Sequence, residues 1–395
     1  MRAAVYHRPH YYYWALWTAT ASSVFRSTSS LSPSFVTATT SRRQYQTIAT
    51  KSLLNNKAPL QRPSFPRSPF LTASSTVRPM SSSPAGGEGA NPLRVALCQF
   101  PVTESKEVNH ATARDYLDRA ASQGAQLIVL PEIWNAPYAT LAFPEYAEVI
   151  EDRKGSSSSL SSSSPSANLL REKALEHGVW IVGGSIPERV LNSDGSDNDK
   201  IYNTCLVFDP RGNLVAKHRK VHLFDINVPG GITFYESDTL SPGNTLSHFT
   251  TPDWGDIGLG ICYDIRFAEY AMLLCQLHET CRILIYPGAF NLTTGPAHWE
   301  LLQRARAVDN QCFVLTASPA RTEAPKEAGK YPNYTAWGHS SVVSPWGDVV
   351  ATIDEQPGIV VADLDLTQAD SVRRSIPIRQ QKRHDLYELK RTQNS

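Results

Sequence analysis

The first 87 residues contain no aspartate or glutamate, although the chain of 395 residues has 37 acidic side chains. This segment carries eight arginines and two lysines, while in the remainder the 28 basic residues are outnumbered by acidic ones. A basic, acid-free segment rich in Ser, Thr, Arg and Pro is typical of a mitochondrial transit peptide. The acidic remainder offers no attraction to phosphates, so nucleic acid is not an expected partner.

We expect residues 1–90 to form a disordered basic leader and residues 91–390 to form the globular part of the chain. A mitochondrial location is predicted, since an inside-negative membrane potential favours a positive segment. The alternative is a basic tail without a targeting role. Met80 lies just before the globular part, and a second translation start there would yield a cytoplasmic form.

Long apolar runs and paired cysteines are also missing. Residues 11–25 are too short and too rich in hydroxyl groups to span a bilayer, and no other segment approaches a membrane span. The six cysteines form no CxxC pair and no cluster, which indicates buried thiols in a reduced compartment instead of a disulfide framework. No membrane partner is expected.

Two patterns that would indicate a metal or a nucleotide are incomplete. His218 and His222 are four residues apart, but their segment is predicted to be extended and no HExxH motif exists. The glycines of Gly183-Gly184 and Gly258-Leu-Gly260 lack a phosphate-binding fingerprint. Neither a zinc site nor a nucleotide site is therefore expected.

After residue 91 the sequence alternates between predicted strands and helices. Strands are expected at 94–100, 126–131, 256–262, 282–286 and 312–317, helices at about 104–123, 266–279 and 297–309, a helix–strand pair over 166–186, and hairpins at 207–216 and 343–351. Strands covered by helices imply a layered α/β domain. Residues 155–166, almost pure serine, are predicted to be a flexible insertion, and residues 192–199 a polar hairpin tip.

Three segments place a reactive side chain at the end of an apolar strand, where ligand crevices form in α/β sheets. They are Leu130-Pro-Glu132, Lys217-His-Arg-Lys220 and Gly258-Leu-Gly-Ile-Cys-Tyr-Asp-Ile-Arg266. Each also has an ordinary structural explanation: a helix cap or solvated charge, an exposed basic face, and a small core residue. Only the combination of the three predicts a functional site.

These segments resemble, in the same order, the three signatures of the nitrilase (carbon–nitrogen hydrolase) superfamily. The resemblance extends from about Leu93 to about Glu388. Segments 224–230, 239–243 and 286–300 resemble the omega-amidase branch of that family more narrowly. The leader and the serine-rich insertion lie outside the resemblance.

The resemblance implies an α/β fold, a four-layer αββα sandwich that pairs as a homodimer and needs no metal or organic cofactor. It also implies a catalytic triad of Glu132, Lys220 and Cys262. Glu236, in Ile232-Thr-Phe-Tyr-Glu-Ser237, matches a second glutamate with which many members position the lysine and the substrate.

Elementary chemistry agrees with these roles. An amide is a poor electrophile, so its hydrolysis benefits from acyl transfer to the Cys262 thiolate and later hydrolysis of the thioester. A shielded Glu132 carboxylate can take the thiol proton, pass it to departing ammonia and then activate water. We expect Lys220 and the backbone N–H of Tyr263 to bind the oxyanion, where one lost donor costs about 3 kcal/mol.

The omega-amidase resemblance implies a small-molecule substrate, a 2-oxo dicarboxylic acid monoamide such as 2-oxoglutaramate or 2-oxosuccinamate. The carboxylate of such a ligand needs a cation, and the forked guanidinium of Arg266 suits it. The alternative role of Arg266 is a salt bridge in the first helical turn. Tyr138, Phe290 and Thr294 match the walls of the family's substrate pocket.

Three functions stay open from the sequence. The first is an omega-amidase. The second is another amidase of the superfamily, such as a deaminated-glutathione amidase, a nitrilase or a carbamoyl hydrolase, which ammonia release from different substrates would separate. The third is a scaffold protein without activity, which the intact set of Glu132, Lys220 and Cys262 argues against.

Overall fold

The computed structural model describes residues 92–150, 164–192, 194–322 and 329–392. The predicted leader and residues 155–163 of the predicted insertion lie outside them. The described residues belong to one compact unit. No helix among them is long and apolar enough to cross a membrane.

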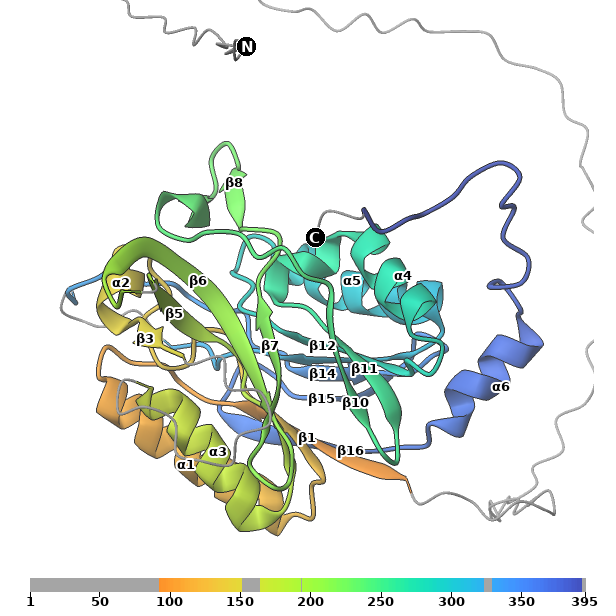
Figure 1. Cartoon of the computed structure of the whole chain (residues 1–395), viewed down its shortest axis with the longest axis horizontal. Coiled ribbons are helices and arrows are strands. Elements are labelled where there is room, and N and C mark those ends of the chain that lie inside the picture. The colour runs from red at the N-terminus through yellow and green to blue at the C-terminus, as the bar shows by residue number, and fades with distance from the viewer. Residues whose placement is uncertain (1–91, 151–163, 193, 323–328, 393–395) are drawn as a thin grey trace, which may run out of the picture. The chain divides into compact units, whose positions relative to one another are not determined.

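Two sheets lie at the centre of this unit (Figure 1). The first has eight strands in the order β16-β1-β2-β4-β6-β5-β3, with β7 paired to β6. They are β1 (Leu93–Gln99), β2 (Leu127–Val129), β3 (Glu148–Val149), β4 (Trp180–Val182), β5 (Ile186–Leu191), β6 (Asp197–Phe208), β7 (Leu214–Arg219) and β16 (Gly358–Leu364).

The second sheet has six strands in the order β10-β11-β12-β13-β14-β15. They are β10 (Ser247–Thr251), β11 (Gly255–Leu259), β12 (Ile283–Pro287), β13 (Phe313–Ala317), β14 (Ser341–Val343) and β15 (Val349–Thr352). A separate two-stranded ribbon consists of β8 (Asp225–Asn227) and β9 (Thr233–Tyr235). Short helical segments are α2 (Phe143–Tyr146), η1 (Glu236–Asp238), η2 (Cys262–Arg266) and α6 (Thr367–Ser375).

The alternation of side chains along β1 shows how the layers are stacked. Val95 and Leu97 belong to the core shared with the second sheet, whereas Ala96 and Cys98 face the core beneath α1 (Lys106–Ser122) and α3 (Pro165–His177). On the opposite side, α4 (Ala268–Leu277) and α5 (Gly295–Asn310) cover the second sheet (Figure 1). The order helix, sheet, sheet, helix confirms the predicted αββα sandwich.

Local sequence signals explain where several helices begin and end. The hydroxyl of Ser105 accepts a hydrogen bond from the Val108 N–H at 3.2 Å and caps α1. Pro165 fits the first turn of α3, and Gly178, with φ of 64°, ends this helix in the left-handed conformation.

The prediction of a flexible loop through residue 166 is wrong at its end. Ser164 and Ser166 are fully buried, and Ser166 already lies in α3. Its N–H donates to Glu148 Oε2 at 2.9 Å and its hydroxyl to Oε1 at 2.6 Å. A buried carboxylate therefore fixes the start of this helix, which composition alone does not reveal.

The connection after β11 also differs from the prediction. The strand ends at Leu259, and the 3-10 turn η2 separates it from α4, which begins at Ala268. The expected hairpin at residues 192–199 is present between β5 and β6, but β6 already starts at Asp197. In both places a side-chain or ladder interaction shifts the end of an element by a few residues.

Candidate active site

Glu132 follows β2 in a tightly restrained turn. A Cβ on Gly184 would lie 2.0 Å from the carbonyl oxygen of Pro131, so only glycine allows this close approach of the two chains. Ile133 has a positive φ of 49° and donates its N–H to Ser185 Oγ at 3.0 Å. These restraints hold the Glu132 side chain in a position where it is fully buried.

Alternation along β7 divides the run Lys217-His-Arg-Lys220 between two faces. Lys217 and Arg219 both reach Glu188, at 2.6 and 2.8 Å. His218 and Lys220 point to the other side and are fully buried. The backbone at Lys220 is fixed by a bond from its N–H to Asn203 O at 2.8 Å.

Lys220 lies between two buried carboxylates. Its Nζ is 2.9 Å from Glu132 Oε1 and 2.9 Å from Glu236 Oε2. All three side chains have no exposed surface. The cluster contains one positive and two negative groups, and neighbouring donors stabilise the excess negative charge.

Those donors come from side chains and from the backbone. Asn203 Nδ2 donates to Glu132 Oε1 at 2.8 Å, and the Phe224 N–H donates to Glu236 Oε2 at 2.7 Å. The hydroxyl of Tyr138 donates to Glu236 Oε1 at 2.7 Å and lies 3.3 Å from Glu132 Oε1. Burial raises the pKa of Tyr138 well above its usual value, so the phenol remains a donor.

Cys262 joins the same cluster from η2. Its φ of 44° is unusual for a residue other than glycine. A Cβ on Gly288 would lie 3.2 Å from the Cys262 Cα, so the neighbouring loop passes close to the cysteine. The thiol lies close enough to Glu132 and to the backbone N–H of Ala289 for both to shift its pKa, and the same N–H donates to Glu132 Oε2 at 2.8 Å.

The electrostatics of the cluster raise the pKa values of both the thiol and the carboxylate. Burial raises the pKa of Glu132; Lys220 opposes this effect and Glu236 adds to it. Burial and the charge of Glu132 raise the pKa of Cys262, while Lys220 opposes them. Burial alone would lower the pKa of Lys220, but the two glutamates raise it, so the lysine stays charged. An incoming electrophile therefore meets a thiol with a proton acceptor and a fixed cation beside it.

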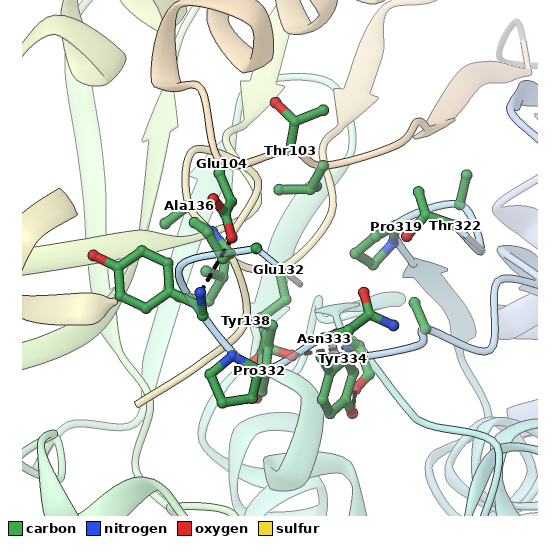
Figure 2. A pocket seen from close by; sticks show the side chains of 18 residues that line it. Thr103, Glu104, Glu132, Ala136, Tyr138, Pro319, Thr322, Pro332, Asn333 and Tyr334 are labelled. Carbon is green, nitrogen blue, oxygen red and sulfur yellow. Dashed lines mark hydrogen bonds between the residues drawn. The ribbon is translucent and has the colours of Figure 1, made fainter. Parts of the chain in front are cut away.

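A pocket of about 350 Å³ lies beside this cluster, of which Glu132 is the member that lines it (Figure 2). Glu132, Tyr138 and Ala289 line it together with Tyr334, and Thr103 lies across the pocket from Tyr334 (Figure 2). The rings of Tyr138 and Tyr334 contact each other, with centroids 4.5 Å apart. The pocket thus ends beside the Glu132 carboxylate, which itself has no exposed surface.

The remaining predicted substrate residues are not all in one place. The guanidinium carbon of Arg266 lies 4.8 Å from the centroid of the Phe290 ring and 5.3 Å from that of Tyr263. Arg266, Phe290 and Thr294 are all outside the lining of the pocket described above. The hydroxyl of Thr294 donates to Asn291 Oδ1 at 3.3 Å, just before α5.

Arg266 forms no salt bridge within the described residues, so the alternative of a salt bridge in the first helical turn is wrong. Its Nη1 lies 3.1 Å from His298 Nδ1, and its buried Nε has no hydrogen-bond partner in this part of the chain. An arginine held by aromatic rings, without a carboxylate, is suited to bind an anion.

Asp264 and Asn203 are two site residues that the sequence did not identify. Asp264 is fully buried; its Oδ2 accepts the Ile261 N–H at 2.9 Å, and its Oδ1 accepts the N–H of His222 at 2.9 Å. His218 Nε2 lies 3.3 Å from the same carboxylate. Asp264 therefore links the residue before Cys262 to the segment that carries Lys220. For Asp264 and Asn203 alike, the available signal in the sequence was a polar residue within an otherwise apolar strand or turn.

The comparisons with known proteins agree with this geometry. The family model for carbon–nitrogen hydrolases matches residues 94–374. This chain belongs to the carbon–nitrogen hydrolase family. Over 302 residues the hydrolase is 50% identical to the omega-amidase NIT2 of Xenopus tropicalis, covering 76% of this chain and 99% of that protein. It is 52% identical to the omega-amidase NIT2 of Bos taurus over 297 residues, covering 75% of this chain and 97% of that one.

Solved structures show the same fold. The hydrolase aligns with Saccharomyces cerevisiae Nit3, a member of branch 10 of the nitrilase superfamily, with a TM-score of 0.63 and 39% identity. That alignment covers 76% of this chain and 100% of the yeast chain. The NitFhit protein of C. elegans aligns with a TM-score of 0.59 and 30% identity, covering 76% of this chain and 67% of that one.

Proposed function

We propose that this hydrolase is an omega-amidase, which converts a 2-oxo dicarboxylic acid monoamide, such as 2-oxoglutaramate or 2-oxosuccinamate, to the 2-oxo acid and ammonia. Its similarity to omega-amidases over nearly their whole length supports the activity. The observation that carries the mechanism is that the Glu132 carboxylate binds the Lys220 ammonium at 2.9 Å and lies beside the Cys262 thiol, whose pKa its charge raises.

In the first half-reaction, Glu132 accepts the thiol proton as the Cys262 sulfur attacks the amide carbon. Negative charge then develops on the former carbonyl oxygen, and Lys220 and the Tyr263 N–H stabilise it. Glu132 gives its proton to the amide nitrogen, the C–N bond breaks and ammonia leaves. The acyl group remains on the sulfur as a thioester.

In the second half-reaction, Glu132 takes a proton from a water molecule that attacks the thioester. The C–S bond breaks, the sulfur recovers the proton, and the acid product leaves. Glu236 holds the Lys220 ammonium in place, and the hydroxyl of Tyr138 in turn fixes the Glu236 carboxylate. The steps use these side chains, the backbone N–H of Tyr263, the substrate and water.

Arg266 is proposed to bind the substrate carboxylate that lies distal to the amide. Its charge is close enough to Cys262 for the two groups to affect each other's ionisation, and it has no carboxylate of its own within the described residues. Phe290 packs against the guanidinium and orients it. A neutral amide would leave this partly buried cation without a partner, so monoamides of dicarboxylic acids are preferred.

The test is a panel of substrates scored by ammonia release. We expect the highest kcat/KM for 2-oxoglutaramate or 2-oxosuccinamate, with lower values for deaminated glutathione, carbamoyl compounds, simple nitriles and neutral amides. A higher value for deaminated glutathione would move the assignment to that neighbouring amidase. An absence of ammonia from every member of the panel would favour the scaffold function.

We also propose a mitochondrial location and a homodimer. The acid-free composition of residues 1–90 supports the first, and a fluorescent protein fused to them should enter mitochondria, whereas translation from Met80 should leave it cytoplasmic. Exposed apolar side chains on α5, Leu301 and Val308, support the second. Light scattering should give twice the mass of one chain.

A further inference from the structure

Three potential metal ligands converge on the second sheet, outside the cluster around Cys262. His248 lies on β10, Asp256 on β11, and His278 directly after α4. Their ligand atoms all lie within 4.8 Å of one another. The steps proposed for amide hydrolysis use none of these three side chains.

The chemistry of the set matches one class of metal ion. Two imidazoles and one carboxylate form a common three-residue ligand set for zinc, with water at the fourth position. Ligand atoms around a tetrahedral zinc are about 3.4 Å apart, given zinc–ligand bonds of about 2.1 Å, so a small movement of these side chains is sufficient. All three are half-buried, which leaves them both restrained and open to solvent.

The carboxylate is already oriented by neighbouring hydroxyl groups. Thr250, opposite Asp256 in the β10–β11 ladder, donates to Asp256 Oδ1 at 2.6 Å. Thr280, two residues after His278, donates to Oδ2. Metal-binding carboxylates usually have such hydrogen-bonding partners, which fix the direction of the remaining lone pairs.

A second cluster in the described part of the chain shows what a filled cation position looks like. Asp118, Glu176 and His177 also lie within 4.8 Å of one another. There, the ammonium of Lys173 is 2.6 Å from Asp118 and 2.9 Å from Glu176. Asp256, in contrast, forms no ion pair with a lysine or arginine among the described residues, so its charge is available to a metal ion.

The two histidine rings already lie side by side. Their rings contact each other with centroids 3.4 Å apart. Each ring needs to turn by only a small amount for one of its nitrogens to face an ion bound by Asp256.

We propose that His248, Asp256 and His278 bind one zinc ion. The two rings separate on binding, so that one nitrogen of each faces the ion together with the oxygen of Asp256. The zinc ion links the β10–β11 hairpin to the connection between α4 and β12. Since only the folded chain brings the ligands together, zinc raises the thermal stability of the protein.

Zinc titration of the full chain in competition with a chromophoric chelator tests this site. The Cys262→Ala variant is the parent protein, because its missing thiol removes the most reactive competing ligand. We expect one zinc equivalent in the parent. His248→Gln and His278→Gln should each weaken it at least about 100-fold, and Thr280→Val, which keeps all three ligands, about tenfold.

His177→Gln is the matched control, because it removes a histidine from the cluster that Lys173 occupies. It should bind zinc as the parent does, and zinc should raise the melting temperature of this control but not of the two ligand variants. Zinc binding that survives in both ligand variants, or a parent that binds no zinc at micromolar concentration, overturns the proposal. If a ligand variant fails to fold, Thr280→Val decides, since an unchanged affinity contradicts the site.

Discussion

Glu132 and Glu188 are both buried glutamates, and both bind cations from the run Lys217-His-Arg-Lys220, yet their surroundings differ. Glu188 binds two cations, with Arg219 donating through Nε and Nη2 at 2.8 Å each. Glu132 must share the single cation of Lys220 with Glu236. One side of β7 has an excess of positive charge, and the other has an excess of negative charge.

This difference separates a structural carboxylate from a reactive one. Burial alone would raise the pKa of Glu188, but Arg219 and Lys217 lower it below its usual value. Burial raises the pKa of Glu132, and its single shared lysine does not reverse the effect. Glu188 therefore stays ionised, whereas Glu132 can accept and release a proton. The charge balance around a glutamate, more than its burial, decides which task it can perform.

The most damaging change on the Glu132 side should be Cys262→Ala. Without the sulfur no thioester forms, and ammonia release should fall by roughly ten-thousandfold or more. Cys205→Ala is the control, because this buried thiol also has a raised pKa but no carboxylate partner among the described residues. Steady-state ammonia assays and circular dichroism separate lost chemistry from lost folding. Equal activity of the two variants would contradict the assignment.

The pair Glu132→Gln and Glu188→Gln tests the comparison itself. Both amides keep the shape of the side chain and lose its ability to take a proton. We expect kcat/KM to fall about a thousandfold for Glu132→Gln, since general base catalysis contributes this much, and to change little for Glu188→Gln. Comparable losses in the two variants would remove the distinction between reactive and structural carboxylates.

Lys220→Met and Lys217→Met test the two faces of β7. Loss of the Lys220 cation should lower kcat about a hundredfold or more, because it removes an oxyanion donor. It should also destabilise the fold by about 3 to 5 kcal/mol, since two buried carboxylates lose their partner. Lys217→Met should leave kcat nearly unchanged. A larger catalytic loss at Lys217 would reverse the comparison.

Arg266→Ala extends the comparison to a cation that forms no ion pair with a carboxylate among the described residues. We expect KM to rise for amides that carry a distal carboxylate, with kcat/KM falling about ten- to a hundredfold, the range of one charge-assisted hydrogen bond or two. Neutral amides should lose little. Equal losses on charged and neutral amides, measured side by side, would indicate a structural role.

The smallest effect is the pH dependence of stability. The pKa of Glu188 is lowered in the folded state, so its contribution is present at neutral pH and is lost as the pH falls through and below about 4. Glu188→Gln should therefore reduce the free energy of unfolding by about 2 kcal/mol at pH 7, and the difference should shrink in acid. Denaturant titrations at several pH values measure it, and a difference that grows in acid would contradict the sign.

Glu132→Gln should show the opposite dependence. The pKa of Glu132 is raised in the folded state, so its contribution is present below the unfolded pKa and is lost as the pH rises through the folded one. At neutral pH this variant should therefore be destabilised less than Glu188→Gln. The same denaturant titrations provide the comparison.

Much of the fold could be predicted from the sequence because its strands and helices have clear apolar patterns. The predicted strand at 282–286 and helix at 297–309 differ from β12 and α5 by at most two residues at either end. The αββα arrangement came from resemblance to a family, since strand order depends on contacts between distant segments. The turn η2 could not be predicted, because Asp264 stabilises it by accepting the N–H of His222 from another segment.

The site was predictable only in part for the same reason. Glu132, Lys220 and Cys262 stood out because each ends an apolar strand, and the structure brings them together. Asn203 and Asp264 were missed, since a single polar residue in a strand or turn gives no sign of its partners. Arg266, Phe290 and Thr294 were expected to line the substrate pocket, and their part in substrate binding stays a prediction, since none of the three lines the pocket beside Glu132.

The most direct test of the Glu132–Cys262 chemistry is the mass of the Cys262 peptide after rapid mixing with 2-oxoglutaramate and quenching in acid. The predicted result is a peptide heavier by the substrate minus ammonia, seen in the wild-type protein and absent from Cys262→Ala. Ammonia release in the wild type without this acyl adduct, together with undiminished release in Cys262→Ala, would contradict a thioester on this sulfur.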